Sequence, residues 1–188
     1  PTRRYSTSIA LVSQSGQPIV AAVYDPVHDE LYEAVTGRGV TLNGERISTF
    51  GSDRGDATRM TWFADRSLPS YSYFAAVAAE FDVRFVGGAV VNALQLLTHP
   101  QSVYAKAPKE AQSGCAIWDL AAVALMVQEH GGSAFAYGGQ PLHLNRAESV
   151  FFNDVGFAFV SGDVVVDELL RRLEVIVLTA ESPEGAPL

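Results

Sequence analysis

The sequence predicts a mixed α/β fold of α+β layered type, in which an antiparallel meander precedes a half that alternates strands and helices. Two observations support this prediction. Through residue 50, short apolar runs are separated by turns of Gly, Pro, Asn and Asp. From residue 60 to residue 161, runs with strand character alternate with segments of helical apolar spacing.

Length and composition indicate an ordinary globular chain. Its 188 residues, 48% of them hydrophobic and 18% charged, are enough to bury a sizeable core. The polar loop at residues 51–58 is the best internal boundary. We therefore expect a meander over residues 1–55 that completes an N-terminal subdomain, a C-terminal α/β subdomain over residues 56–180, and a frayed tail over residues 181–188.

Charge and cysteine content exclude several classes of partner. A net charge of −8 disfavours a nucleic-acid polymer or an anionic membrane surface, because both require clustered Lys and Arg. No run reaches about 18 apolar residues, so we expect no membrane segment. The single cysteine, Cys115, excludes an intrachain disulfide, favours packing against small residues and predicts a reducing, cytoplasmic location. Because the chain begins at Pro1 rather than Met, we expect a longer gene product.

The meander is predicted strand by strand. Strands are expected at residues 8–12, 18–24, 30–35 and 40–42, and Asn43–Gly44 is a strong hairpin signal. The segment Asp25–Glu30 carries three acids and His28, but it is explained as the reversal between two strands, with His28 solvated.

The second half is predicted in the same way. Strands are expected at residues 60–64, 83–86, 103–105, 134–137 and 157–160. Helices are expected at residues 67–80, 90–97 and 164–173, and from Ile117 to the Gly131–Gly132 stop. His143, between Leu142 and Leu144, is expected to be a packed histidine rather than a metal ligand.

Asp119 is the candidate metal ligand. It falls in the first turn of an apparently amphipathic helix of about four turns, where free N–H groups and the helix dipole favour a carboxylate. The plain interpretation is a charge that stabilises the helix start. The functional one is a ligand for Mg²⁺, which prefers oxygen and commonly uses one or two carboxylates plus substrate phosphate. Glu129 would lie roughly 15 Å further along the helix and does not complete such a site.

The residues around Asp119 resemble the second signature of the inositol monophosphatase family. That family comprises Mg²⁺-dependent, Li⁺-sensitive phosphomonoesterases, including 3'(2'),5'-bisphosphate nucleotidases. The resemblance implies a sandwich like that of inositol monophosphatases and sugar phosphatases, and it implies that Asp119 binds metal. It is carried by Trp118-Asp119-x-Ala121-Ala122, Glu129-x-Gly131-Gly132 and Gly139-x-Pro141-Leu142, and by Ser8–Leu11, Gly16-x-Pro18, Val23–Pro26, Glu30–Tyr32, Gly37-x-Gly39 and Leu42–Gly44 in the meander.

The family's first metal signature, Asp-Pro-[Ile/Leu]-Asp-Gly-Thr, is absent from the sequence. The segment Asp25–Glu30 does not replace it, because it lacks the Gly-Thr pair and its second acid is one residue too far. The resemblance therefore implies that the catalytic residues lie upstream of Pro1, in a fold truncated at the N-terminus.

Two segments are candidates for substrate contact. Gly87, Gly88 and Ala89 match the family's Gly-[Ser/Thr]-Ala step with Gly in place of the hydroxyl residue, although a tight turn explains two glycines equally well. Lys106 and Lys109 precede the Asp119 helix. They are either solvated or placed to meet a second phosphate. Arg66, in a segment resembling the family's Ser-Arg-Ser step, either pairs with an acid or faces substrate.

The leading hypothesis is a Mg²⁺-dependent phosphomonoesterase that hydrolyses a small phosphorylated metabolite with metal-activated water. A 3'(2'),5'-bisphosphate nucleotide or an inositol monophosphate is the expected substrate, and Gln112 and Ser113, where inositol recognition would use an acid, mildly favour the former. Two alternatives stay open: a non-catalytic binding or oligomerising module, and a related sugar phosphatase such as a fructose bisphosphatase. The resemblance also allows a homodimer.

Overall fold

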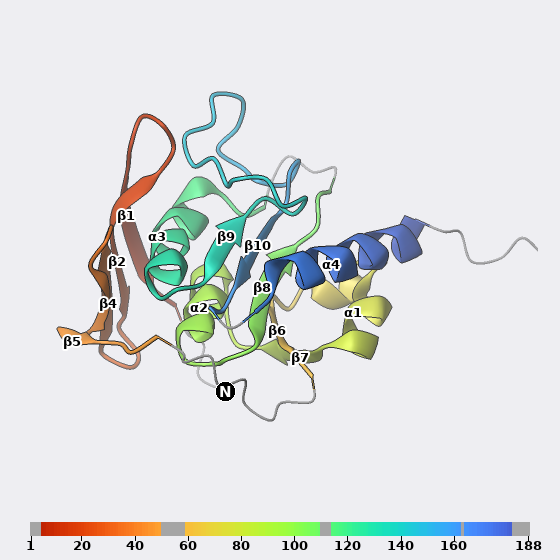
Figure 1. Cartoon of the computed structure of the whole chain (residues 1–188), viewed down its shortest axis with the longest axis horizontal. Coiled ribbons are helices and arrows are strands. Elements are labelled where there is room, and N and C mark those ends of the chain that lie inside the picture. Colours follow the sequence, from red (N-terminus) through yellow and green to blue (C-terminus); the bar gives the residue numbers. More distant parts are fainter. Residues whose placement is uncertain (1–4, 50–58, 110–113, 163, 182–188) are drawn as a thin grey trace, which may run out of the picture.

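Two five-stranded sheets and the helices between and beside them form the molecule, in four layers (Figure 1). The computed structural model describes residues 5–49, 59–109, 114–162 and 164–181, with side-chain environments through residue 176. In Figure 1 the layers follow one another from left to right as sheet, helices, sheet and helices. The expected mixed α/β fold, with an antiparallel half before an alternating half, is confirmed.

The first sheet is a simple antiparallel meander in the order β1-β2-β3-β4-β5. Its strands are β1 (Thr7–Val12), β2 (Pro18–Asp25), β3 (Glu30–Val35), β4 (Gly39–Leu42) and β5 (Glu45–Arg46). Asn43 and Gly44 both have positive φ, 51° and 82°, as the predicted hairpin between β4 and β5 requires. Asn43 also accepts the Leu31 N–H through its side-chain oxygen at 2.8 Å, which fixes the turn against β3.

The second sheet is mixed, in the order β7-β6-β8-β10-β9. Its strands are β6 (Thr61–Ala64), β7 (Asp82–Phe85), β8 (Ser102–Lys106), β9 (Ser133–Phe135) and β10 (Phe157–Val160). β6 pairs in parallel with β7 and β8, whereas β10 pairs antiparallel with β8 and β9. All five predicted strands are present, with bounds that differ from the predicted ones by two residues or fewer.

The helices differ more from their predicted bounds. They are η1 (Leu68–Ser70), α1 (Phe74–Glu80), α2 (Ala89–Leu94), η2 (Gln95–Leu97), α3 (Ile117–Glu129) and α4 (Val166–Glu181). The single helix expected over residues 67–80 is wrong, because Tyr71 is extended and separates η1 from α1. Arg59 closes α1 by donating to the carbonyls of Ala78 and Ala79.

α4 also departs from the prediction at its C-terminal end. It continues past residue 173, the predicted end, to Glu181. Residues 182–188 lie outside the described part of the chain, as do the predicted boundary at 51–58 and the loop residues Gln112 and Ser113.

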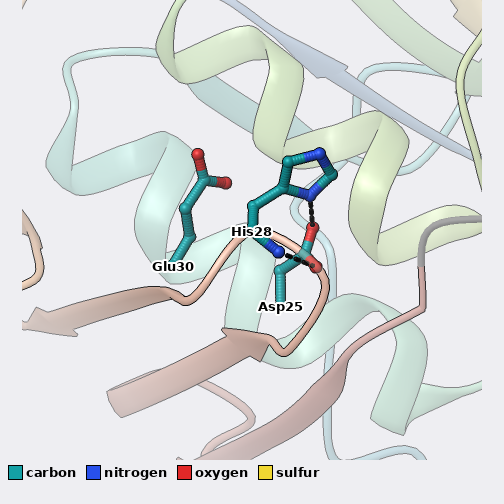
Figure 2. Close-up of side chains that lie close together, drawn as sticks. All are labelled: Asp25, His28 and Glu30. Carbon is teal, nitrogen blue, oxygen red and sulfur yellow. Dashed lines mark hydrogen bonds and ion pairs between the residues drawn. The ribbon is translucent and has the colours of Figure 1, made fainter. Parts of the chain in front are cut away.

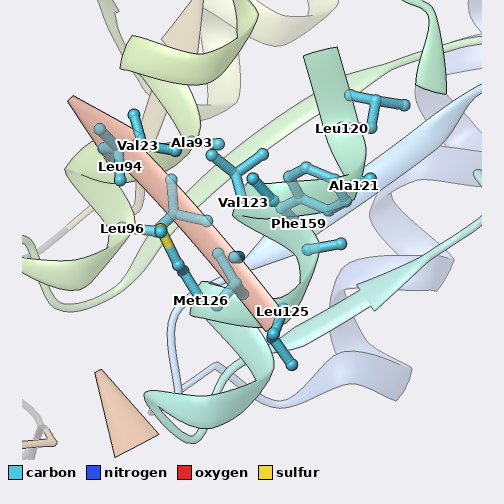
Figure 3. Close-up of a cluster of buried hydrophobic side chains, with 14 of the residues drawn as sticks. Val23, Ala93, Leu94, Leu96, Leu120, Ala121, Val123, Leu125, Met126 and Phe159 are labelled. Atoms are coloured by element: carbon cyan, nitrogen blue, oxygen red, sulfur yellow. The ribbon is translucent and has the colours of Figure 1, made fainter. Parts of the chain in front are cut away.

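α3 lies between the two sheets (Figure 1), and side chains from its middle two turns enter the buried cluster that Figure 3 draws. Every residue from Leu120 through Val127 is buried, so the expected amphipathic helix is wrong. The reason is its position, because a helix enclosed by other elements has no solvated face. One core cluster joins α3 and α2 to the first sheet and to Phe157 and Phe159, and a second packs α1 and α4 on the far side of the second sheet.

The outward face of the first sheet is apolar and exposed. Ile9 and Leu11 on β1 are 66% and 58% exposed, and Val20 beside Leu11 on β2 is 42% exposed. Alternation along the strands turns the small residues Ala10 and Ala21 inward and these larger residues outward. Among the described residues, the helices pack only on the inward face (Figure 1).

None of the helices in the described part of the chain combines the length and the apolar character needed to cross a bilayer.

Candidate functional site

Asp119 lies in the first turn of α3, as predicted, and its two carboxylate oxygens differ. Oδ2 accepts the backbone N–H of Ala116, the N-cap residue, at 2.9 Å, so the side chain does close the helix start. The side chain is half-buried, and within the described residues it forms no ion pair with Lys or Arg. Oδ1 is therefore left for another ligand, and both interpretations of Asp119 fit its geometry.

Lys106 is the centre of a half-buried polar cluster. It lies at the end of β8 and forms an ion pair with Asp65, with the two side chains 25% and 19% exposed. Its Nζ is also 3.1 Å from Sγ of Cys115, which lies two residues before α3 begins. Tyr104 donates its hydroxyl to Oδ1 of Asp65 at 3.3 Å. We call Asp65, Asn92, Tyr104, Lys106 and Cys115 the Lys106 cluster.

The charge state of this cluster follows from burial and proximity. Burial disfavours a charged Lys106, but the adjacent Cys115 sulfur and Asp65 carboxylate together raise the pKa of Lys106 above its usual range. Burial also raises the pKa of the Cys115 thiol, against the opposing effect of Lys106. The thiol is thus neutral at pH 7, and the raised pKa keeps Lys106 charged there.

Lys106 has one N–H donor that the described residues do not use. An ammonium group carries three N–H donors, and Asp65 and Cys115 account for two of them. Within the described residues no protein acceptor receives the third. Lys106 is therefore not a freely solvated lysine but a half-buried ammonium held by Asp65 and Cys115, with one donor that neither of them uses.

The Gly87–Ala89 turn connects β7 to α2 and is fixed by Asn92. Gly87 donates its N–H to Oδ1 of Asn92 at 3.1 Å, and its carbonyl accepts from Nδ2 of the same side chain at 3.0 Å. A Cβ on Gly87 would lie 2.9 Å from Val91, whereas one on Gly88 would meet nothing within 4 Å. Gly87 is therefore required by packing, but the glycine at 88 is not.

Lys109 and Arg66 are less constrained than Lys106. Lys109 is exposed, its Nζ donates to the hydroxyl of Tyr71 at 3.0 Å, and it lies 5.3 Å from the centre of the Tyr71 ring. Arg66 is exposed and has no acidic partner among the described residues. Pairing with an acid, one of the two roles expected for Arg66, is therefore not observed in that part of the chain.

Asp25, His28 and Glu30 form the group of potential metal ligands that the described residues bring together, with one ligand atom of each within 4.8 Å of the others (Figure 2). Asp25 is fully buried, however, and its oxygens accept the Val27 N–H at 2.9 Å and the His28 ring at 3.0 Å. Tyr32 donates to Glu30 at 3.1 Å. These bonds build the turn between β2 and β3, which is the role that the sequence predicted for this segment.

Two other polar residues have structural positions. Glu129 accepts the backbone N–H groups of Gly37 and Gly39, each at 2.8 Å, and so anchors the turn before β4 to the end of α3. His143 is exposed, so the packed histidine we expected is wrong. Leu142 and Leu144 on either side of it are buried, whereas His143 faces outward beside Gly16.

An open pocket of about 740 Å³ lies beside the loop that follows β9. Pro108, Leu142, Arg146, Phe152 and Asp154 are among its lining residues, and Asp119 and Lys106 are not. Arg146, the one Lys or Arg among its lining residues, forms an ion pair with Asp154, and the exposed Glu148 also lines it. The pocket therefore offers no unpaired Lys or Arg for a phosphate.

The fold and the motif around Asp119 together define a family. The sequence profile of the inositol monophosphatase family matches residues 2–174, and the chain belongs to that family. Two solved structures share the fold. The Thermotoga maritima IMPase superposes with a TM-score of 0.67 at 20% identity, over 93% of this chain and 63% of that one. The inositol monophosphatase from Anabaena (Nostoc) sp. PCC 7120 gives 0.66 at 23% identity, over 89% and 65%.

Curated relatives carry two kinds of name. The Nus factor SuhB of Xylella fastidiosa is 30% identical over 141 residues, which are 72% of this chain and 49% of that protein. The inositol-1-monophosphatase of Bacillus subtilis is 26% identical over 153 residues, which are 79% and 55%. This chain thus spans about half the length of the curated relatives it matches.

Proposed function

We propose that these residues belong to a Mg²⁺-dependent phosphomonoesterase that hydrolyses a small phosphorylated metabolite. Asp119 would supply one ligand of the metal, which polarises the phosphate and activates the attacking water. The observation that carries the proposal is the half-buried Asp119 carboxylate, with one oxygen used by the helix start and the other left for a ligand. Mg²⁺ commonly takes one or two protein carboxylates and completes its shell with water and phosphate.

Substrate contact is assigned to the Gly87–Gly88–Ala89 turn, to Lys106 and to Lys109. The ammonium of Lys106 supports this role because it stays protonated and keeps a donor for an anionic oxygen. Lys109 is exposed and is the residue that would reach a second phosphate. We therefore propose a 3'(2'),5'-bisphosphate nucleotide ahead of an inositol monophosphate as the substrate.

Replacing Asp119 by Asn tests the assignment. The amide keeps the hydrogen bond to Ala116 but is a poor ligand for Mg²⁺, so turnover of both candidate substrates should fall by orders of magnitude with little loss of stability. Asp167→Asn is the matched control, because Asp167 is an exposed aspartate in the first turn of α4. Phosphate release is measured in the 188-residue chain and in the full product of its gene. Unchanged turnover in Asp119→Asn would show that Asp119 is not a ligand of the catalytic metal.

A non-catalytic module is the second candidate. Its support is that a relative 30% identical to this chain is named a Nus factor, and that the signature Asp-Pro-x-Asp-Gly-Thr does not occur in these residues. The encoding sequence upstream of Pro1 separates the two candidates. If that signature is absent there as well, the phosphatase proposal falls and the non-catalytic one stands.

A further inference from the structure

Asn92 is a buried polar residue to which the motif analysis gave no role. It lies in α2 with a solvent exposure of 0%, and its side-chain amide makes hydrogen bonds in two directions. Toward the turn, it holds both the N–H and the carbonyl of Gly87, at 3.1 and 3.0 Å. Toward the second sheet, its Nδ2 donates to Oδ1 of Asp65 at 2.8 Å.

From these contacts we propose that Asn92 is a positioning residue that places the Gly87–Ala89 turn and the Lys106 ammonium in one fixed frame. Asp65 receives Asn92 and Tyr104 on Oδ1, which leaves Oδ2 for Lys106. The amide therefore orients the carboxylate, and the carboxylate orients the cation. No other side chain among the described residues bonds to both Gly87 and Asp65.

The chemistry of an amide suits this position. Gly87 needs an acceptor for its N–H and a donor for its carbonyl, and Asp65 needs a donor besides Tyr104. A side-chain amide supplies both donors and an acceptor, whereas a carboxylate supplies acceptors only. Burial makes the match important, because an unpaired polar group at this site would lose its water without gaining a partner. The inference rests on the proposed function, since the turn and Lys106 are the residues assigned to substrate there.

Asn92→Asp tests the proposal through pH. At pH 8 the new carboxylate lies against Asp65, and the like charges push the two side chains apart. At pH 5.5 the coupled pair holds a proton, and the resulting O–H again donates to Asp65. Inorganic phosphate with Mg²⁺ is the probe. We expect its affinity to fall about tenfold relative to wild type at pH 8 and to recover most of that loss at pH 5.5.

Leu96→Ala is the matched control. Leu96 is 1% exposed in the adjoining η2 turn and makes no polar contact, so its truncation lowers stability without touching the cluster. Phosphate affinity relative to wild type should then stay within about twofold at both pH values. If Leu96→Ala shows the same pH-dependent loss as Asn92→Asp, or if Asn92→Asp binds as wild type at pH 8, the positioning role is wrong.

A second readout needs no ligand. Asn92→Asp should speed amide hydrogen exchange at Gly87 and acylation of the Lys106 amine by acetic anhydride, because both groups lose their fixed partner. Should Asn92→Asp fail to fold, Asn92→Ala, which buries no charge, takes its place with the same expectation. Unchanged exchange and acylation would overturn the inference. A wild-type chain that binds no phosphate would instead overturn the proposed function, and the two failures are thereby distinguished.

Discussion

At the scale of single residues, the two oxygens of Asp119 differ, since one belongs to the helix start and the other is the proposed metal ligand. Oδ2 closes the start of α3 by accepting the Ala116 N–H, and this bond also fixes the direction of the carboxylate. A carboxylate held in one rotamer loses less conformational entropy when it binds a metal than a free one does. The helix-stabilising interpretation and the metal-binding one are therefore not exclusive.

The sequence located Asp119 and the Gly87–Ala89 turn but not the residues that connect the turn to Lys106. Asp119 is recognisable because its neighbours within about 25 residues carry the motif. Asn92 and Asp65 lie in different elements, 27 positions apart, and a single Asn within an apolar helical run carries no local signal of its partners. Such contacts follow from how α2 packs on the second sheet, which residue patterns do not encode.

Gly88 gives a prediction at this scale. A Cβ at residue 88 meets nothing within 4 Å, and Gly88 is the N-cap of α2 with negative φ. Gly88→Ser should therefore fold normally, gain a few tenths of a kcal/mol from its capping hydroxyl, and lower KM by adding a donor beside the substrate. Gly87→Ser is the control, and should lose about 1–3 kcal/mol because its Cβ lies 2.9 Å from Val91.

Urea unfolding and KM measurements check this pair. Equal destabilisation of the two variants would contradict the open space assigned to residue 88.

His130, the residue after α3, predicts a pH dependence of stability. Burial lowers its pKa below the usual 6.5, although its hydrogen bond to the Ser48 carbonyl acts in the opposite direction. Between the lowered folded pKa and 6.5 the unfolded chain binds more protons, so the free energy of unfolding rises with pH across that window. The contribution of His130 to the free energy of unfolding is thus fully present above pH 6.5 and is lost as the pH falls toward the pKa of His130 in the folded state.

The measurement is urea unfolding between pH 5 and pH 7.5. His130→Gln should reduce the rise of the free energy of unfolding with pH, because its amide can still donate to the Ser48 carbonyl but does not titrate. His143→Gln, at an exposed histidine, serves as the control. A His130→Gln slope identical to wild type would show that this histidine does not contribute.

At the scale of elements, the two ends of α3 could be predicted from the sequence, whereas its burial could not. Its start at the Trp-Asp motif and its end before Gly131–Gly132 were predicted from local signals, and the structure has α3 at Ile117–Glu129. Its environment was predicted wrongly. The alanines at residues 121, 122 and 124 are each 4% exposed or less, so their small size reflects close approach to other elements.

Overpacking α3 tests that explanation. Ala122→Leu adds three carbons at a position that is 1% exposed, and should lower the free energy of unfolding by about 1–3 kcal/mol. Gln128→Leu, at an exposed position of the same helix, should change it by no more than about 0.5 kcal/mol. Chemical denaturation of both variants is the measurement, and a well-tolerated Ala122→Leu would contradict the close packing of α3.

At the scale of the whole molecule, the first sheet and its order were predictable because consecutive strands are joined by short turns. The order of the second sheet was not, since β10 inserts between β8 and β9 after a long excursion through α3 and the loop following β9. The apolar outward face of the first sheet, with Ile9 and Leu11 exposed, is typical of surfaces that other polypeptide covers. This chain matches 60–65% of the length of its structural neighbours.

The proposed phosphatase depends on Asp119 holding Mg²⁺ against a substrate phosphate. Calorimetric titration with Mg²⁺ in the presence of inorganic phosphate, on the wild-type chain and on Asp119→Asn, measures that binding. We expect saturable heat in the wild type that Asp119→Asn abolishes and Asp167→Asn preserves. Equal Mg²⁺ binding by wild type and Asp119→Asn would contradict it.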